Sequence, residues 1–264
     1  MARPSLGTTI YIVSQDENSW DEEARSAREV GAEHITIHLE YPLGNGRLRE
    51  RQLRRLRNLL KGKRLLLRAP SSWPSLITPH EGLYRLSLQE LKETLALAPA
   101  LGVELFILRG GAAPFQRGVE PIATGQLREG LRELGSLAQE IGLTLAIENL
   151  SWGYPSRAGE LEETLAFAPS PGLKLSLDLG QARAGGEEPV ELLRQLTKTE
   201  RLVRVALGPG EELRPLLAYL EGVAFLTLDF PPRGALPQPG RWSLIQEELL
   251  RLKAVLEEWA EPTR

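Results

Sequence analysis

Two apolar segments near the middle of the chain carry an acidic side chain at or near their ends. LTLAIE, residues 143–148, ends in Glu148, and LKLSLDLG, residues 173–180, carries Asp178. A stretch with helical spacing, residues 159–168, separates them. This pattern predicts two adjacent parallel strands with carboxylates at their C-terminal ends, where ligands and catalytic groups lie in parallel α/β folds. An acid is costly to bury in an apolar strand, so we expect both to bind a partner or a metal.

The same strand–helix unit repeats along the sequence. We predict strands at residues 8–14, 34–39, 64–68, 103–108, 143–148, 173–180, 202–207 and 223–229. We predict helices at residues 21–30, 47–60, 88–101, 125–141, 159–168, 189–197, 211–220 and 244–259, the last with Ser243 as its N-cap. Eight alternating units favour an α/β fold with one domain over residues 1–264, a single (β/α)8 TIM barrel. An open doubly wound sheet is the alternative, but such sheets usually have fewer units.

Composition and charge exclude several classes of protein. The net charge is −3, so the chain has no general attraction to nucleic acid. It contains no cysteine, which excludes disulfides, thiolate metal sites and a cysteine nucleophile. The N-terminal apolar run is too short to span a membrane and lacks the layout of a signal peptide, so we expect a cytoplasmic protein. The single methionine and 19 prolines fit a thermostable protein, although genome base composition explains them equally well.

The motifs at the strand ends resemble the xylose-isomerase-like TIM barrel superfamily. This group contains sugar phosphate isomerases and epimerases and the endonuclease IV type of DNA-repair enzyme. The most specific match is Glu148-Asn149 followed one unit later by LDLGQA, residues 177–182, where the family has an E-N pair and a D-x-G-H motif. Weaker matches are Ala69-Pro70, Gly111, Arg85 with Ser87, and Gly208 with Gly210. The resemblance covers nearly the whole chain.

The resemblance also implies a divalent metal, held by carboxylates and histidines of the last four strands. Glu148 and Asp178 match this pattern, but Gln181 replaces one expected histidine and Asp229 replaces an expected glutamate. The expected histidine of the seventh strand is also absent, because Arg204 and its neighbours occupy that region. The remaining oxygen ligands, Glu148, Asp178, Asp229 and the Gln181 amide, suit Mg²⁺ or Mn²⁺. Zinc, including the trinuclear site of the repair enzymes, lacks its usual nitrogen ligands here.

Two arginines stand where the family commonly has histidines, at the ends of the third and fourth strands. These are Arg68 and Arg109, and both are expected to point toward the carboxylates. Arginine keeps its proton near neutral pH, so neither can act as a base. They either form buried ion pairs with Glu148, Asp178 or Asp229, replacing the charge of a metal, or bind an anionic substrate group. We favour the ion pair for at least one of them, which makes the metal dispensable.

Other candidate contacts depend on where the barrel places them. His38 ends the second strand on its inward face and is either a rim histidine or a substrate contact. Trp152 follows Asn149 in a loop, where it either walls a sugar pocket or anchors the loop. His34 is expected to be structural and His80 to lie in a solvated loop.

The leading hypothesis is a sugar or sugar phosphate isomerase or epimerase. Glu148 or Asp229 would be the base next to a substrate carbonyl, and a hard cation or Arg109 would stabilise the enediolate. Arg68, His38, Asn149 and Trp152 would contact the small-molecule substrate. The alternative is a family member without catalysis, which binds an anionic ligand or a protein partner. Loss of the expected histidines supports this alternative, and the sequence leaves the oligomeric state open.

Overall fold

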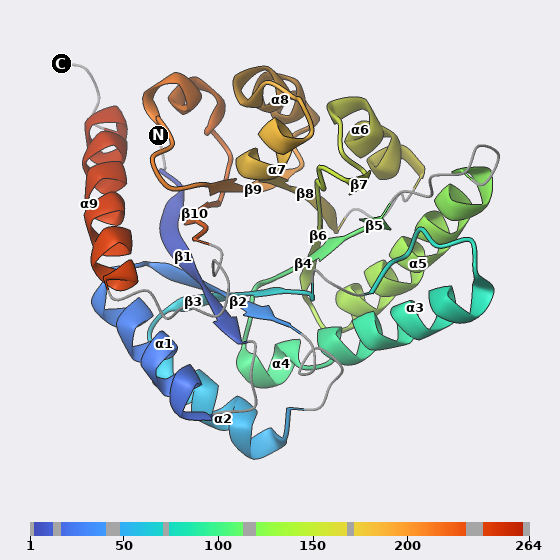
Figure 1. Cartoon of the computed structure of the whole chain (residues 1–264), viewed down its shortest axis with the longest axis horizontal. Coiled ribbons are helices and arrows are strands. Elements are labelled where there is room, and N and C mark those ends of the chain that lie inside the picture. Colours follow the sequence, from blue (N-terminus) through green and yellow to red (C-terminus); the bar gives the residue numbers. More distant parts are fainter. Residues whose placement is uncertain are drawn as a thin grey trace.

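The strands of the chain close into a parallel barrel surrounded by helices (Figure 1). This computed structural model describes residues 3–12, 17–40, 48–70, 74–112, 120–167, 172–230 and 240–260. The barrel strands are β1 (Ser5–Ile12), β2 (His34–Leu39), β3 (Arg64–Arg68), β4 (Leu105–Arg109), β6 (Thr144–Glu148), β8 (Leu173–Asp178), β9 (Leu202–Leu207) and β10 (Phe225–Leu228). They pair in the order β1-β10-β9-β8-β6-β4-β3-β2, which confirms the predicted single (β/α)8 TIM barrel.

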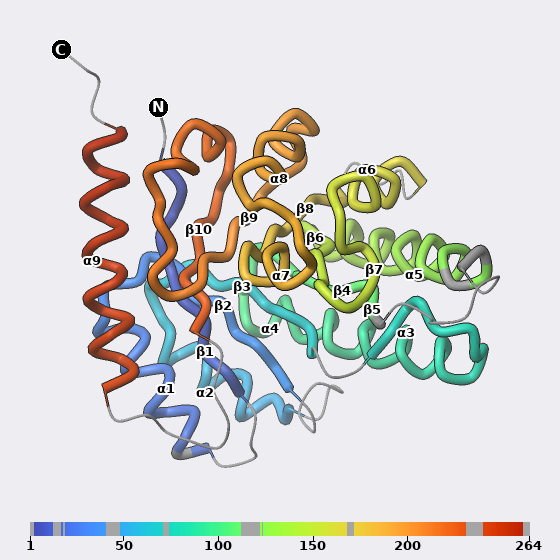
Figure 2. Tube along the Cα trace, turned by 45° about the horizontal axis from the view of Figure 1, so that its top comes forward, coloured from blue at the N-terminus to red at the C-terminus, as the bar shows by residue number. Residues whose placement is uncertain are grey.

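The helices form the outer layer of the barrel. They are α1 (Glu17–Glu29), α2 (Glu50–Leu59), α3 (Glu81–Leu95), α4 (Ala98–Leu101), α5 (Glu120–Glu140), α6 (Ala158–Phe167), α7 (Leu179–Ala184), α8 (Pro189–Leu196) and α9 (Arg241–Ala260). Two short strands, β5 (Gly111–Ala112) and β7 (Gly153–Tyr154), pair outside the barrel. The C-terminal helix α9 lies beside β1 and closes the outer layer (Figures 1 and 2). No helix among the described residues is long and apolar enough to cross a membrane.

Alternation along the strands divides the buried side chains into two clusters. Leu66 of β3 belongs to a small cluster inside the barrel, whereas its neighbours Leu65 and Leu67 belong to the large cluster under the helices. Successive side chains of a strand point to opposite faces, so this division follows from the strand geometry. The inner cluster contains Leu66, Leu105, Ile107, Ala146 and Phe225. The remaining space inside the barrel is therefore available to the polar side chains of the other strands.

Several element boundaries differ from those predicted, and local chemistry explains most of the differences. Helix α3 begins at Glu81, seven residues before the predicted start, because the ring of His80 accepts a hydrogen bond from the Leu83 amide and caps it. The predicted helix over 88–101 is two helices, and Pro99 lies in the first turn of α4. Asp178 caps helix α7, which the sequence did not predict.

The last two predicted helices also begin elsewhere. Residues 211–220 contain only a short 3₁₀ helix, Arg214–Tyr219, with Pro215 in its first turn, where it removes a backbone donor. Helix α9 begins at Arg241, so Ser243 lies inside it and is not its N-cap. The end of the first predicted strand lies outside the described residues.

His34 fills the closed end of the barrel, as its expected structural role requires. Its Nδ1 lies 3.2 Å from the Ser5 hydroxyl and its Nε2 lies 2.9 Å from the Thr227 hydroxyl. The ring lies against the backbone of Gly7. A Cβ atom added to Gly7 would lie 2.6 Å from the ring and 2.2 Å from the His34 carbonyl oxygen. Burial, followed by the charges of Arg204 and Arg64, lowers the pKa of His34 to about 3. His34 is therefore neutral near pH 7.

This buried histidine predicts a loss of stability in mild acid. Below its ordinary pKa of 6.5, His34 takes up a proton in the unfolded chain but not in the folded one, so the free energy of unfolding falls as the pH falls. The slope from one such histidine approaches about 1.4 kcal/mol per pH unit. We expect His34→Gln, which cannot titrate, to reduce the slope measured by urea denaturation between about pH 7 and pH 5. An unchanged slope in this variant would contradict the assignment. His38 contributes in the same direction in both proteins, because its pKa is also lowered.

Candidate active site at the barrel mouth

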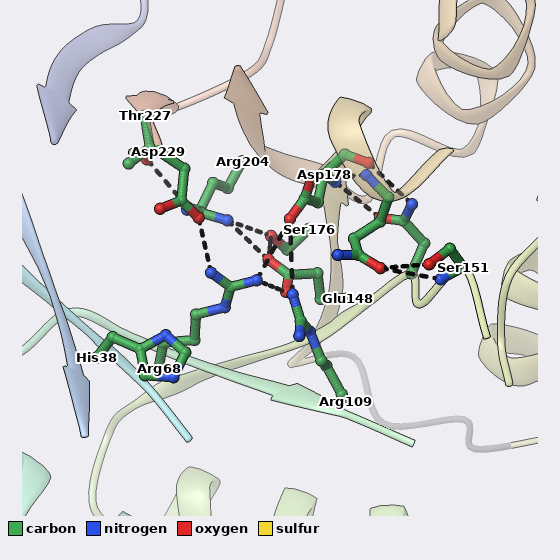
Figure 3. A network of polar contacts seen from close by, with 12 residues as sticks. His38, Arg68, Arg109, Glu148, Ser151, Ser176, Asp178, Arg204, Thr227 and Asp229 are labelled. Atoms are coloured by element: carbon green, nitrogen blue, oxygen red, sulfur yellow. Dashed lines mark hydrogen bonds and ion pairs between the residues drawn. The ribbon is translucent and has the colours of Figure 1, made fainter. Parts of the chain in front are cut away.

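Six charged side chains converge at the C-terminal ends of the barrel strands (Figure 3). The three acids come from β6, β8 and the residue after β10, and the three arginines come from β3, β4 and β9. The acids are Glu148, Asp178 and Asp229, and the arginines are Arg68, Arg109 and Arg204. The barrel therefore brings together every carboxylate and arginine that the sequence analysis placed at this face.

Glu148 is the centre of this network. Its side chain is completely buried, and its Oε2 accepts hydrogen bonds from Arg68 and from Nε of Arg109 at 2.8 Å. Its Oε1 accepts one from Nη1 of Arg204 at 2.9 Å and a longer one from the Ser176 hydroxyl at 3.4 Å. Burial alone would raise the pKa of Glu148, but the charges of the three arginines outweigh it and hold this pKa well below its usual range. Glu148 is thus a fixed anion near neutral pH.

Arg68 joins the three acids to one another. Its Nη1 donates to Oδ2 of Asp229 at 2.7 Å, and its Nη2 donates to Glu148 and lies 3.4 Å from Oδ2 of Asp178. Burial opposes its charge, but Glu148, Asp229 and Asp178 raise the pKa of Arg68 well above its usual value. Arg109 also pairs with Glu148, and its Nη2 lies 3.6 Å from Asp178. The prediction of an ion pair for at least one of these arginines is therefore confirmed, and the structure shows ion pairs for both.

Arg204 connects this network to the closed end of the barrel. It is completely buried, and its Nε donates to the Thr227 hydroxyl at 3.0 Å, which in turn lies beside His34. Its Nη1 donates to the Ser176 hydroxyl at 3.0 Å as well as to Glu148. The sequence analysis treated Arg204 only as the replacement of a histidine. The signal for its role was an arginine inside the apolar strand LVRVAL, residues 202–207, because such a charge requires an acidic partner.

Asp178 is the least tightly held of the three acids. Its Oδ1 caps helix α7 by accepting from the Gln181 amide at 3.0 Å, whereas its Oδ2 lies no closer than 3.4 Å to a guanidinium. Burial is the largest cause that raises the pKa of Asp178, and the charges of Glu148 and Asp229 raise it further against the opposing effect of Arg68. Asp178 also lines the cavity at the mouth. It is the one acid of the three whose pKa is raised.

Asn149 holds the end of β8 in place. Its side chain donates to the Asp178 carbonyl at 2.9 Å and accepts from the Asp178 amide at 2.7 Å. It is completely buried, so its contacts do not support the predicted role as a substrate ligand. The pair of hydrogen bonds instead fixes the backbone from which the Asp178 side chain projects.

Tyr11 is a member of the site that the sequence analysis missed. Its hydroxyl donates to Oδ1 of Asp229, and its ring stacks on His38 with the centroids 5.0 Å apart. Burial would raise the pKa of Asp229, but Arg68, Arg204 and this hydroxyl lower it. Tyr11 pairs in register with His38, on the inward face of the barrel. Counting alternate residues along 5–12 would have placed Tyr11 on this face from the sequence.

His38 lines the cavity at the mouth and contains a buried ring nitrogen without a partner among the described residues. Its Nε2 lies 2.8 Å from Oε1 of Glu40, which can only accept, so Nε2 carries the proton and Nδ1 has the lone pair. Burial lowers the pKa of His38, which keeps the ring neutral. Its Nδ1 is buried and has no hydrogen-bond partner among the described residues. The predicted substrate contact of His38 therefore rests on its place in the cavity wall and stays a prediction.

A cavity of about 320 Å³ opens above the charged network. Its walls include Tyr11, His38, Arg68, Arg109, Asp178, Gly180, Gln181, Leu207, Gly208, Pro209 and Asp229. Glu148 lies beneath this surface and is not part of the wall, which argues against its predicted role as the base. Trp152 is 54% exposed and does not line this cavity, so the predicted substrate contact is not supported.

The arrangement does not fit the divalent metal that the resemblance implied. The guanidinium of Arg68 lies between the three carboxylates that were predicted as ligands. The Gln181 amide oxygen, the fourth predicted ligand, accepts from the amide and hydroxyl of Ser151 at 3.1 and 2.8 Å. Within the described ranges, no cluster of three or more histidines and acids is arranged to hold a metal ion. The charges at the mouth are thus balanced by arginines.

Comparisons with known proteins agree with this architecture. The family model described as xylose isomerase-like TIM barrel matches residues 24–208. The chain belongs to this family. No curated protein shows significant sequence similarity to the chain.

Solved structures of the xylose isomerase-like fold superpose on nearly the whole chain at low sequence identity. A D-tagatose 3-epimerase-like protein is 17% identical, with a TM-score of 0.77 over 97% of this chain and 100% of its own. D-psicose 3-epimerase in the presence of D-fructose is 14% identical, with a TM-score of 0.73 over 94% and 97%. A family member from Mycobacterium smegmatis in complex with magnesium is 15% identical, with a TM-score of 0.69 over 94% and 91%. At this identity the likeness establishes the fold.

The completely buried Arg204 is expected to matter more for stability than the partly exposed Arg109. Arg204→Met leaves an excess negative charge that water cannot reach, and such losses cost about 3–5 kcal/mol. The Arg109 side chain is already 14% exposed. Water can therefore hydrate the carboxylate left unpaired by Arg109→Met, which reduces the loss of stability. Urea denaturation of both variants measures the difference. Equal losses would contradict the expectation that complete burial makes Arg204 the more costly of the two to remove. Adding Glu148→Gln to Arg204→Met should recover part of the loss.

Proposed function

We propose that this protein moves a proton next to the carbonyl group of a small sugar or polyol, as an isomerase or epimerase. The observation that carries the proposal is Asp178, a cavity-lining acid whose pKa is raised and which lies beside Arg109. A base must be accessible to the substrate and must have a proton affinity that suits the working pH. Glu148 and Asp229, the bases first expected, have lowered pKa values because arginines hold their charges.

In the proposed reaction, Asp178 takes the proton from the carbon next to the carbonyl. The electron pair of the broken C–H bond forms a carbon–carbon double bond, and the carbonyl electrons move to oxygen to give an enediolate. Arg109 lines the same cavity and is already charged, so it stabilises the oxygen anion without a change of protonation. Protonation of the same carbon by solvent on its opposite face gives an epimer. Protonation of the former carbonyl carbon gives an isomer, with the proton of the neighbouring hydroxyl passing to the alkoxide as the new carbonyl forms.

The remaining walls suit the hydroxyl groups of a sugar. The neutral ring of His38 lines the cavity and is held by Glu40, and its buried Nδ1 has no hydrogen-bond partner among the described residues. Tyr11 provides a flat ring beside it, which covers the apolar face of a sugar. The cavity volume of about 320 Å³ lies at the small end of ligand-binding pockets, so we propose a monosaccharide or a similar polyol.

The second candidate is a member that binds such a ligand without transforming it. The observation in its favour is that the three arginines are already paired with the three acids, which leaves few free charges for chemistry. The two candidates differ in one measurable respect. Only the enzyme exchanges a carbon-bound hydrogen of the ligand with solvent.

Hydrogen exchange in D₂O tests the proposal. A panel of aldoses and ketoses, with and without a phosphate group, is incubated with the protein in EDTA and followed by proton NMR. We expect loss of the signal next to the carbonyl for at least one sugar, and a decrease of about 10²–10⁴-fold with Asp178→Asn. Glu191→Gln on the exposed face of α8 is the matched control, which removes a carboxylate far from the mouth.

The outcomes separate the two candidates. If Asp178→Asn leaves the rate of hydrogen exchange unchanged, Asp178 is not the base. A sugar that raises the melting temperature without any exchange would instead support the non-catalytic binder.

A further inference from the structure

The three acids at the mouth share one cation, and that cation belongs to the protein. Arg68 approaches Asp229 with Nη1 and both Glu148 and Asp178 with Nη2. Arg109 pairs with two of these acids and Arg204 with one. Among the described residues, Arg68 is therefore the side chain that touches all three (Figure 3).

The position of Arg68 is enforced by burial and by like charges. Its side chain is only 4% exposed, and the acids it joins come from three different strands that converge on the barrel axis. Three carboxylates this close repel one another unless a positive charge lies between them. A guanidinium keeps its proton at every pH at which the protein folds, so its charge is permanent.

We infer that Arg68 has taken the place of a divalent cation in this barrel, so that the chain carries its own counter-charge and needs no metal. A hard divalent ion in an all-oxygen site would collect the same carboxylate groups. The guanidinium instead gives each acid a directed hydrogen bond or ion pair and excludes an ion from the space between them. This inference concerns charge balance alone, and it holds whether or not the proposed reaction is correct.

The inference predicts that removing the guanidinium creates a divalent-ion site. Without Arg68, the guanidiniums left against the three acids within the described residues are those of Arg109, beside Glu148 and Asp178, and Arg204, beside Glu148. The space vacated by the side chain is then bounded by oxygen atoms of Glu148, Asp178 and Asp229, which suits Mn²⁺. The natural protein, by contrast, is expected to bind no stoichiometric Mn²⁺ at these acids.

The test is a Mn²⁺ titration of the full chain after removal of metals, read by the EPR signal of free Mn²⁺ and by thermal melts. The proteins are the natural chain, Arg68→Ala and Arg68→Gln, with Arg109→Ala as the matched loss of one guanidinium at the same mouth. We expect one bound Mn²⁺ per chain and a Mn²⁺-dependent rise of the melting temperature in the Arg68 variants only. The melt of the natural chain should not change with EDTA.

Each outcome decides the inference. One equivalent of Mn²⁺ bound by the natural chain and lost in Asp178→Asn would overturn it. An Arg68 variant that folds only when Mn²⁺ is added would support it, because the ion then replaces the missing charge. Arg68 variants that fold without gaining Mn²⁺, or that fail to fold even with Mn²⁺, would overturn it. Failure of the sugar exchange experiment alone would affect only the proposed reaction.

Discussion

A buried balance of three acids and three arginines determines the character of this barrel. Glu148 is surrounded by Arg68, Arg109 and Arg204 without any exposure to water, so its charge is tolerated only because the three guanidiniums are in place. Arg204 also donates a hydrogen bond to Thr227, which contacts His34 at the closed end of the barrel. These contacts connect the mouth of the barrel to its closed end through one network of polar side chains.

The same balance assigns different tasks to chemically similar side chains. Glu148 and Asp229 are held as anions by arginines, whereas Asp178 keeps one oxygen near the cavity and has a raised pKa. The difference follows from the number and distance of the guanidiniums that each acid meets. Asp178 is positioned by its backbone, through Asn149, and by capping α7, so its side chain does not depend on a strong ion pair. Local contacts thus give the three acids different proton affinities.

Much of the architecture was predictable because it depends on periodicity within short segments. Alternating apolar strands and amphipathic helices gave the closed barrel, and the ends of LTLAIE and LKLSLD located two site acids. The predicted element boundaries were wrong where a single side chain set them. Examples are His80 at the start of α3 and Pro215 in the 3₁₀ helix. Tyr11 and Arg204 were missed because their roles depend on partners that are distant in the sequence. Tyr11 contacts Asp229, and Arg204 contacts Glu148.

The sequence by itself determined the family, the barrel and five of the six charged residues at its mouth, the exception being Arg204. It also showed that histidines expected as metal ligands are replaced, and that arginines are present. Only the tertiary structure decided which charges meet, because Arg68 and Asp229 lie 161 residues apart and come into contact only when the barrel closes. Burial and distance then set the proton affinity of each acid, and neither quantity is a property of residue type. For this reason Asp178, rather than Glu148, emerges as the acid that faces the cavity with a raised pKa.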